Sequence, residues 1–418
     1  FMAAEGPLLA AVIARLGDPK PNLAAFGIAY ALGLILEAPV IMVLSAATAL
    51  ADGGHAFRRL RRFVGAMNVA VTIAQVAIVA TPAWEPSTTL LRLPPDVDRL
   101  ARIGLALLAP WPAAIGYRRF HQGLLSRAGR TRQVAHGTVV RLSVMAATAA
   151  GLFVSGRAPG AWVGCLALSA GVCAEALAAR WMARDEVARL GAEPDDHTHP
   201  DRRLSYRAIT AFYIPLAATS LIGLAVQPLT TFFMARARAP LESLAVLPVV
   251  HALTFLFRAT GLSYQDVAIS LLGRPDRRRG DVLRFGMWLG VGASVALGAI
   301  AWTPLAGVWF GSVSGLTPEL IGFAIPPTRW LTLLPALSVL LSLQRAILVD
   351  ARRTVALTTA TAAELAGVAL GLLVLIRGLD WIGATAAAVA LLAGRLVANT
   401  WLLPPCARAL RRERDARA

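Results

Sequence analysis

Ionisable side chains interrupt the long apolar runs of this sequence, at positions where hydropathy predicts the interior of a membrane. A charge at the centre of a membrane-spanning helix costs about 2.5–3.5 kcal/mol, so each one indicates either a function or an internal partner. Carboxylates there can bind a cation or a proton, and guanidinium groups can bind a carboxylate or a phosphate. The candidate substrate-binding or coupling residues are Glu37, Arg141, Glu175, His251, Arg258, Arg329, Glu364 and Arg395.

The elements that position these residues are predicted to be membrane-spanning helices. Of the 418 residues, 57% are hydrophobic and only 16% are charged, against roughly 45–50% and 25% in soluble domains. At about 20 residues per crossing, the chain has room for about a dozen helices and for no large soluble domain. The apolar runs predict twelve spans, the first of them truncated, at residues 1–16, 23–51, 63–82, 98–126, 133–155, 160–182, 207–235, 242–272, 284–308, 318–348, 354–376 and 381–405.

The basic residues indicate the orientation of the chain. The formal net charge is +17, and Lys20 is the only lysine. Most arginines fall in alternate loops, including the clusters around residues 58–62, 118–132, 180–207 and 274–284, and in the tail at 408–417. Positively charged loops stay in the cytoplasm, so we expect both termini there and a multi-pass location in the cell (inner) membrane. From this distribution of arginines we expect the positive charge to face the lipid bilayer and not nucleic acid.

Two kinds of chemistry are not favoured by the sequence. A phosphate-binding loop needs a lysine after its second glycine, whereas Lys20 lies in an Asp-Pro-Lys-Pro segment. Cys165, Cys173 and Cys406 have no spacing typical of a zinc site or a disulfide framework. We therefore expect no enzyme activity, no cofactor and no metal.

One cluster of acidic and histidine residues lies outside the spans. It consists of Asp195, Asp196, His197, His199 and Asp201. These types can ligate a metal, but nothing in the sequence orders them, and a solvated, flexible cytoplasmic connector is the better interpretation. The spans have no acid-rich motif of the kind that an intramembrane prenyl transferase needs.

An internal repeat divides the chain into two halves. A shift of 221 residues aligns Arg15 with Arg236 and Pro19 with Pro240, and a later shift of 219 aligns Trp162 with Trp381. An even number of helices in each half makes the repeat parallel and predicts a substrate site between the halves near the midplane. We expect an all-α protein with 12 transmembrane helices in two pseudo-symmetric six-helix bundles: residues 1–182, a cytoplasmic linker at 183–206, residues 207–408 and a basic tail at 409–418.

The repeat relates the intramembrane charges to one another. Glu37 aligns with Arg258, Arg141 lies within about one turn of the counterpart of Glu364, and Glu175 falls beside the counterpart of Arg395. One hypothesis has Glu37 and Arg258 facing each other across a central cavity, where they bind substrate or form an ion pair that breaks during transport. The other has each charge satisfied within its own half by carbonyls, hydroxyls or water.

Prolines are predicted to interrupt two further spans at similar places in the two halves. They remove backbone hydrogen bonds and allow bending that suits a rocking motion. Arg329 follows one of these groups and is expected at the mouth of the cavity. The residues are Pro110 and Pro112 in the first half, and Pro326, Pro327 and Pro335 in the second.

These features resemble a known superfamily. Two six-helix halves, and a long second helix that ends in an Ala/Ser-rich stretch, Gly53-Gly54 and an arginine cluster, are similar to the multidrug/oligosaccharidyl-lipid/polysaccharide exporters. Within it, the chain most resembles the progressive ankylosis transporter family, through the segments Leu23–Tyr30, Trp111-Pro112 with His121 and Gly123, Pro248–His251, Gly383–Thr385 and Leu391–Gly394.

The resemblance implies a MATE-like, V-shaped pair of bundles, alternating access and export of polyvalent anions such as citrate, pyrophosphate or nucleotide. Arg258 and Arg329 would then be anion ligands, with a proton or sodium as a coupling ion and a monomer as the working unit. A proton- or sodium-coupled multidrug exporter that uses Glu37 and Glu175 is an alternative, as is a flippase for a lipid-linked substrate. The major facilitator fold also has two parallel six-helix halves and is a further alternative.

Overall fold

The structure is a computed structural model that describes residues 5–51, 53–91, 93–193, 204–272, 279–351 and 355–415. Over these residues the chain is helical and contains no strand, apart from one isolated bridge between Arg238 and Ile382. Ten of the described helices are long and apolar enough to cross a membrane, and Glu5–Ala14 and Ser220–Met234 are shorter apolar helices. The predicted all-α polytopic membrane fold is confirmed. The acidic and histidine cluster at 195–201 lies outside the described residues.

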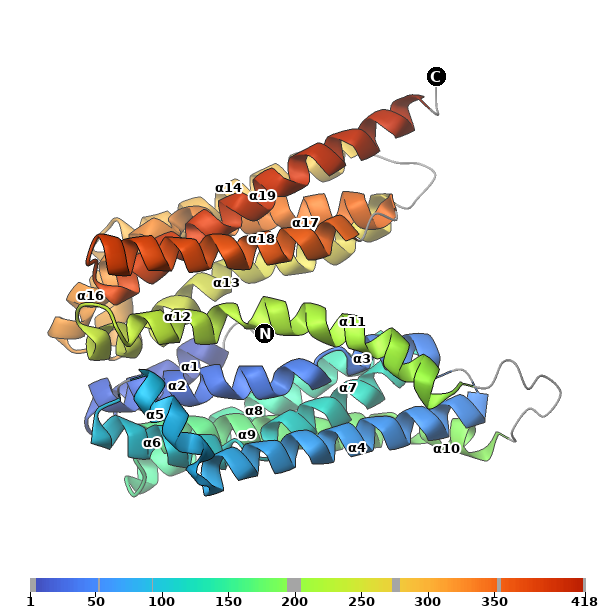
Figure 1. Cartoon of the computed structure of the whole chain (residues 1–418), viewed down its shortest axis with the longest axis horizontal. Coiled ribbons are helices and arrows are strands. Elements are labelled where there is room, and N and C mark those ends of the chain that lie inside the picture. The colour runs from blue at the N-terminus through green and yellow to red at the C-terminus, as the bar shows by residue number, and fades with distance from the viewer. Residues whose placement is uncertain are drawn as a thin grey trace. The chain divides into compact units, whose positions relative to one another are not determined.

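Packing divides the chain into two units. The first consists of Leu16–Pro228, and the second combines Ala3–Arg15 with Leu229–Ala418, so the first helix joins the second unit. These units are defined by contacts, whereas the predicted lobes at 1–182 and 207–408 were defined by the repeat and stay a prediction. In Figure 1 the helices of both units are labelled and coloured by their position in the sequence.

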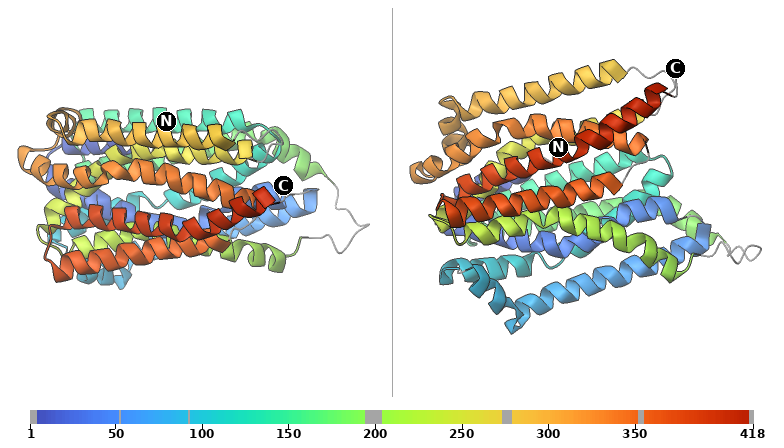
Figure 2. Two further views of the ribbon diagram at one scale, coloured as in Figure 1. Left: turned by 90° about the horizontal axis from the view of Figure 1, so that it is seen from above. Right: turned by 45° about the horizontal axis from the view of Figure 1, so that its top comes forward.

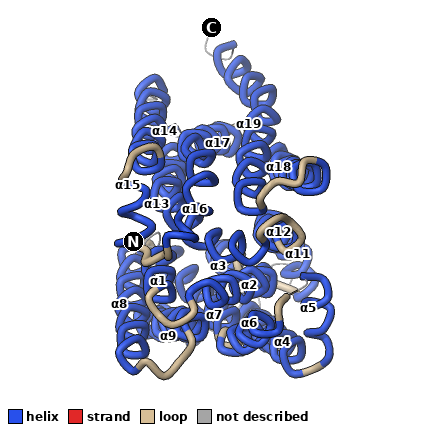
Figure 3. The backbone as a smooth tube through the Cα atoms, turned by 90° about the vertical axis from the view of Figure 1, so that its left-hand side faces the viewer, coloured by secondary structure: helices blue, strands red, loops and turns tan. Residues whose placement is uncertain are grey.

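The first unit is a bundle in which α9 packs against α2, α6, α7 and α8. Figure 3 looks along these helices from one end. Large side chains such as Leu23, Leu105 and Leu124 are fully buried in it. Its helices are α2 (Pro19–Glu37), η2 (Ala38–Val40), α3 (Val43–Leu50), α4 (Gly53–Ala80), η3 (Pro82–Trp84), α5 (Glu85–Leu91), α6 (Pro95–Leu107), α7 (Trp111–Arg127), α8 (Thr131–Ser155), α9 (Gly160–Met182), α10 (Arg184–Ala192) and α11 (Tyr206–Leu224).

The second unit has the same kind of architecture. Its α18 and α19 run side by side, and α17 packs against α13, α14 and α19 (Figure 2). Its helices are α1 (Glu5–Ala14), most of α12 (Val226–Met234), α13 (Pro240–Leu272), α14 (Arg279–Ala301), α15 (Leu305–Gly307), η5 (Val308–Val313), α16 (Pro318–Trp330), η6 (Leu331–Leu333), α17 (Leu334–Asp350), α18 (Val355–Leu372), η7 (Leu373–Gly378) and α19 (Gly383–Asp415).

Backbone geometry reproduces the repeat at the start of the second helix of each half. α2 begins at Pro19 and α13 begins at Pro240, the pair that the shift of 221 aligns. The preceding residues, Asp18 and Ala239, both adopt positive φ, at 52° and 49°. A left-handed residue before a proline is rare for side chains other than glycine, so its recurrence at aligned positions is strong evidence for two related halves.

The later part of the repeat has a different register from the one predicted. α9 begins at Gly160 and α19 at Gly383, and α7 and α17 begin at Trp111 and Leu334, so the helix starts are offset by 223 residues. The shift of 219 from Trp162 to Trp381 is therefore wrong by about one helical turn. Trp162 lies inside α9 whereas Trp381 precedes α19, and the Trp-x-Gly likeness between them does not reflect equivalent positions.

Three predicted spans are interrupted where prolines remove backbone donors. The run 23–51 breaks at η2, which contains Pro39, between α2 and α3. The run 98–126 breaks between α6 and α7, and the run 318–348 breaks at η6, at the equivalent place in the second half. The predicted interruption at similar places in the two halves is confirmed.

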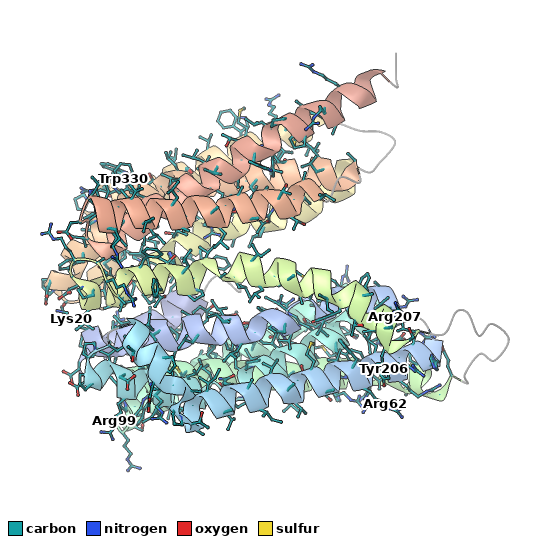
Figure 4. The ribbon with its side chains drawn as sticks, in the orientation of Figure 1. Lys20, Arg62, Arg99, Tyr206, Arg207 and Trp330 are labelled. Atoms are coloured by element: carbon teal, nitrogen blue, oxygen red, sulfur yellow. The ribbon has the colours of Figure 1, made fainter. Side chains whose placement is uncertain are left out.

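The surface of the helices suits a membrane. α4 exposes Val69, Ile73 and Val76, and α14 exposes Trp288 and Val295. Broad apolar exposure on helices whose backbone groups are satisfied internally is typical of lipid-facing segments. Within the first unit, Lys20 and Arg99 lie at one end of the bundle, and Arg62, Tyr206 and Arg207 lie at the other (Figure 4).

Candidate functional site

Most of the predicted site residues fall into two groups of charged side chains, one inside each unit. The first-unit cluster is Arg118, Arg119 and Gln122 on α7, Arg141 on α8 and Glu175 on α9. The second-unit cluster is His251 and Arg258 on α13, Arg345 on α17, Glu364 on α18 and Arg395 on α19. Each unit thus brings arginines from several helices to one or more acidic residues.

Glu175 is the centre of the first-unit cluster. Its side chain is only 1% exposed. Arg118 Nη1 donates a hydrogen bond to Oε2, Gln122 Nε2 donates to Oε1 at 3.1 Å, and Arg141 Nη1 lies 3.8 Å from Oε2. A buried carboxylate needs such partners because removing it from water costs several kcal/mol.

Local sequence explains how these groups meet. Arg118 and Gln122 are four residues apart and share one face of α7. Gly171 on α9 lets α8 approach closely, since a Cβ at Gly171 would lie 2.9 Å from the carbonyl oxygen of Arg141. This close crossing brings the Arg141 side chain to Glu175 on α9.

Arg119 extends the first-unit cluster toward the break between α2 and α3. It interacts electrostatically with Glu37 as well as with Glu175, Arg118 and Arg141. Among the described residues, its buried Nε–H finds no hydrogen-bond acceptor. With Glu37 added, the described residues of the cluster hold three guanidinium groups against two carboxylates.

Glu37 lies at the point where α2 ends. Its side chain is buried, and η2 begins at the next residue. The hydroxyl of Tyr213 on α11 donates to the carbonyl of Pro39 within this break. Glu37, Arg119 and Tyr213 thus surround an interrupted helix, which is the kind of backbone that is tolerated within a membrane only inside the protein or beside a cavity.

An ion pair between neighbouring helices anchors the second-unit cluster. Arg395 Nη2 lies 2.9 Å from Glu364 Oε1, and both side chains are about 15% exposed. Gly394 makes the contact between α18 and α19 close, since a Cβ there would lie 2.8 Å from the carbonyl oxygen of Glu364. Gly394 follows Glu364 at the same separation as Gly171 follows Arg141. The two halves therefore place a charged residue at the same glycine crossing, with the sign reversed.

Arg258 and Arg345 add positive charge to this pair. Both interact electrostatically with Arg395 and Glu364. Arg258 has a buried Nε–H without an acceptor in the part of the chain that the structure describes. His251 lies two turns before Arg258 on α13 and interacts with it electrostatically. Three guanidinium groups thus share one carboxylate.

Arg329 lies elsewhere in the second unit. Its Nε donates to the carbonyl of Ala301 at 3.2 Å, and its guanidinium carbon lies 5.1 Å from the ring centre of Trp302. Basic side chains commonly bind the last carbonyls of a helix, and Ala301 is the last residue of α14. These described contacts are to the last residue of α14 and the residue that follows it, and not to the second-unit cluster. Its role at a cavity mouth stays a prediction.

The structure gives four of the predicted site residues a charged partner and leaves one predicted pair untested. Arg141, Glu175, Glu364 and Arg395 have oppositely charged partners within their own unit, whereas the second hypothesis expected carbonyls, hydroxyls or water there. The predicted meeting of Glu37 with Arg258 joins the two units and stays a prediction, as do the binding and coupling roles of all these residues. Among the described residues, no three His, Cys, Asp or Glu side chains are grouped to hold a metal ion.

Sequence reasoning missed several members of the first-unit cluster. Arg118 and Arg119 were assigned to a cytoplasmic loop, which is wrong, because both lie within the span Pro95–Arg127. Their spacing to Gln122 along one helix face was the available signal. Glu5 on α1 is a further buried carboxylate that was missed, because the first run was treated only as a truncated span.

Comparisons with known proteins identify the fold. No family model matches the chain, and no curated protein matches it. A multidrug resistance MATE family transporter of the MOP superfamily, in an inward-facing conformation, has a TM-score of 0.71 at 15% identity, over 98% of this chain and 94% of that one. The lipid II flippase MurJ, in an inward closed conformation, has a TM-score of 0.72 at 14% identity, over 98% and 89%.

An outward-facing MATE family transporter of the same superfamily is also similar, with a TM-score of 0.54 at 14% identity over 98% of this chain and 95% of that one. At such low identity these likenesses establish the architecture and not the activity. Together with the repeated helix starts at Pro19 and Pro240, they show that this chain has the fold of the MOP superfamily transporters.

Proposed function

We propose that this protein is a secondary active transporter that works by alternating access and carries a polyvalent anion. The observation that carries the proposal is the surplus of guanidinium groups among the described residues of both clusters: three against the carboxylates of Glu37 and Glu175 in the first unit, and three against that of Glu364 in the second. Positive charge within a membrane protein is costly without a partner, and a bound anion supplies that partner. Similar proteins of this fold are known in inward-facing and outward-facing conformations.

Paired and surplus arginines have different roles in this proposal. Arg141 and Arg395 belong to ion pairs at close helix crossings, so their guanidinium groups are already engaged. A buried Nε–H without an acceptor among the described residues is common to Arg118, Arg119, Arg141, Arg258 and Arg395. Arg119 and Arg258 differ in lying outside the ion pairs of Glu175 and Glu364. These two, with Arg345, are the better candidates for anion ligands, and planar guanidinium groups suit carboxylate or phosphate oxygens.

The class of anion follows from charge and from resemblance. Several guanidinium groups match a multiply charged ligand better than a monovalent one. The progressive ankylosis transporters, which the sequence resembles, suggest citrate, pyrophosphate or a nucleotide. We propose export across the inner membrane by a monomer with both termini in the cytoplasm, with Glu37 as a gating or coupling group for a proton or sodium.

A lipid-linked anion is the second candidate, because a diphosphate headgroup presents the same chemistry as pyrophosphate. The similarity in fold to a lipid II flippase supports this second candidate. A multidrug exporter for cations is less well supported, since surplus positive charge in both clusters repels a cationic drug.

Transport into proteoliposomes tests the proposal. Uptake of labelled citrate and pyrophosphate would be measured for the native protein, for Arg258→Gln and for the matched control Arg238→Gln. The control residue is exposed and pairs with the exposed Asp380 at 3.8 Å. Losing a hydrogen bond to a charged group lowers affinity by about tenfold or more, so Arg258→Gln should lose uptake and Arg238→Gln should keep it.

Three results would speak against this assignment. Equal uptake by both variants would remove Arg258 from the site. Transport of a fluorescently labelled lipid diphosphate without any citrate or pyrophosphate uptake would favour the flippase. Drug efflux that is lost in Glu37→Gln but kept in Arg258→Gln would favour the multidrug exporter.

A further inference from the structure

A hollow on the surface of the second unit lies apart from both charged clusters. It has a volume of about 530 Å³ and opens between the start of α18 and residues 400–408 of α19. Its lining residues are Ala356, Thr359, Thr400, Trp401, Pro404, Pro405 and Arg408. Trp401 and Arg408 are exposed, so the hollow is accessible from outside the chain.

The length of α19 places this hollow at a membrane surface. The helix has 33 residues, about 50 Å at 1.5 Å per residue. The hydrocarbon core is only about 30 Å thick, which about 20 residues cross. Counted from Gly383, where α19 begins, the hydrocarbon ends close to Trp401, and Arg408 lies in the headgroup layer. Tryptophan and arginine are typical of that boundary.

The walls of the hollow are held in place by the helices themselves. Trp401 Nε1 donates to Thr359 Oγ1 at 3.2 Å, which ties the indole of α19 to α18. Pro404 and Pro405 have no N–H to donate, so the helical carbonyls one turn before them lose their usual donors. The result is a fixed aromatic wall with a polar backbone edge.

Arg408 supplies the charge at the rim. Its Nε donates to the carbonyl of Pro404 at 3.3 Å, and its terminal Nη groups have no hydrogen-bond or ion-pair partner among the described residues. Those groups can donate to phosphate oxygens in the fork geometry that guanidinium favours. The aromatic wall suits the first carbons of an acyl chain.

We propose that this hollow binds the headgroup of an anionic phospholipid, with Arg408 on the phosphate and Trp401 against the glycerol and upper acyl region. The predicted orientation puts it in the cytoplasmic leaflet, which carries anionic lipid. Nothing in this proposal depends on the identity of the transported substrate.

Native mass spectrometry of the full chain, titrated with lipid in detergent, measures the site directly. Phosphatidylglycerol and phosphatidylcholine would be compared for the native protein and for Arg408→Gln, Ala356→Leu and Arg411→Gln. Arg411 is the matched control, because it is an exposed arginine on the same helix that does not line the hollow. Arg408→Gln should lower phosphatidylglycerol affinity by about fivefold, the contribution of one basic group near an anionic surface.

The remaining variants and ligands decide whether a shaped site exists. Ala356→Leu keeps every charge and fills the hollow, so it should also weaken phosphatidylglycerol binding, whereas Arg411→Gln and phosphatidylcholine binding should stay unchanged. Equal losses in Arg408→Gln and Arg411→Gln would show diffuse attraction and overturn the proposal. Displacement of the lipid by millimolar inorganic phosphate would overturn it too, in favour of a soluble anion.

Discussion

Replacing Glu175 with glutamine should destabilise the first unit strongly. The carboxylate is 1% exposed and serves Arg118, Gln122 and Arg141 together. Glu175→Gln keeps the size of the side chain and removes its charge, so the buried guanidinium groups of Arg118 and Arg141 lose the carboxylate that they share. Breaking a buried pair in this way costs about 3–5 kcal/mol.

The expected change in melting temperature follows from that cost. A unit of about 200 residues loses roughly 2–4 °C per kcal/mol, so Glu175→Gln should lower the melting temperature by roughly 6–20 °C. Tryptophan fluorescence of the detergent-solubilised protein measures it. The matched control is Glu186→Gln, the same substitution at a carboxylate that pairs with the exposed Arg189 at 2.5 Å on α10. A pair with one exposed partner contributes up to about 1 kcal/mol, so the control should lower the melting temperature by no more than roughly 2–4 °C.

A double substitution tests the physical reason. Arg118→Gln added to Glu175→Gln removes one of the stranded charges and should restore part of the lost stability, as expected for residues that act as a unit. Equal shifts for Glu175→Gln and Glu186→Gln would refute the reasoning. So would a double variant that is less stable than the sum of its single changes.

Three further predictions follow from the same structure. Gly394→Ala should lower thermal stability, because its Cβ would lie 2.8 Å from the Glu364 carbonyl oxygen, whereas Gly322→Ala, which meets nothing within 4 Å, should be neutral or stabilising; melting curves of both variants decide this. Arg58→Gln should release the end of α10, since Arg58 Nη1 donates to the carbonyls of Gly191 at 3.1 Å and Glu193 at 3.2 Å, and hydrogen exchange at residues 187–193 should rise without a change in α9. The hydrogen bond from Arg189 lowers the pKa of Glu186, so the pair stabilises the folded state above the unfolded-state pKa and loses that effect as the pH falls through the lower folded-state pKa. Melting temperatures of the native protein and Arg189→Gln should therefore differ at pH 7 and converge as the pH falls below the lowered pKa of Glu186.

The fold was predictable because its signals are local. Hydropathy locates helices, and prolines interrupt them, so the interruption near Pro110 was expected from the sequence. The interruption at Pro39 follows the same rule but was not predicted, since the apolar run at 23–51 predicts one continuous span. The repeat was visible at Pro19 and Pro240 because those residues occupy a constrained turn. The register of the later part of the repeat was not predicted correctly. The likeness of Trp162 and Trp381 depended on one aromatic side chain in a chain rich in alanine and leucine.

The first-unit cluster was harder to predict because it depends on where a span ends. Arg118 and Arg119 stand near the end of an apolar run, and hydropathy alone places such arginines in a loop. Burial depends instead on the partner helix α9, which brings Glu175 to them from 57 residues away in sequence. The membership of α1 in the second unit depends likewise on contacts with α13, which no periodicity within α1 can indicate.

The reversed signs at the two glycine crossings constrain what the repeat can mean for function. Arg141 and Glu364 stand at equivalent positions beside Gly171 and Gly394, and each finds its opposite charge on the neighbouring helix. A ligand-binding role kept from a common ancestor of the two halves would be expected to keep one sign at both places, because an anion cannot be bound by a carboxylate in one half and a guanidinium in the other. A structural pair needs only opposite signs, and either order serves. The crossings are therefore better explained as helix-helix ion pairs, and the arginines outside those pairs are where substitution should alter transport more than stability.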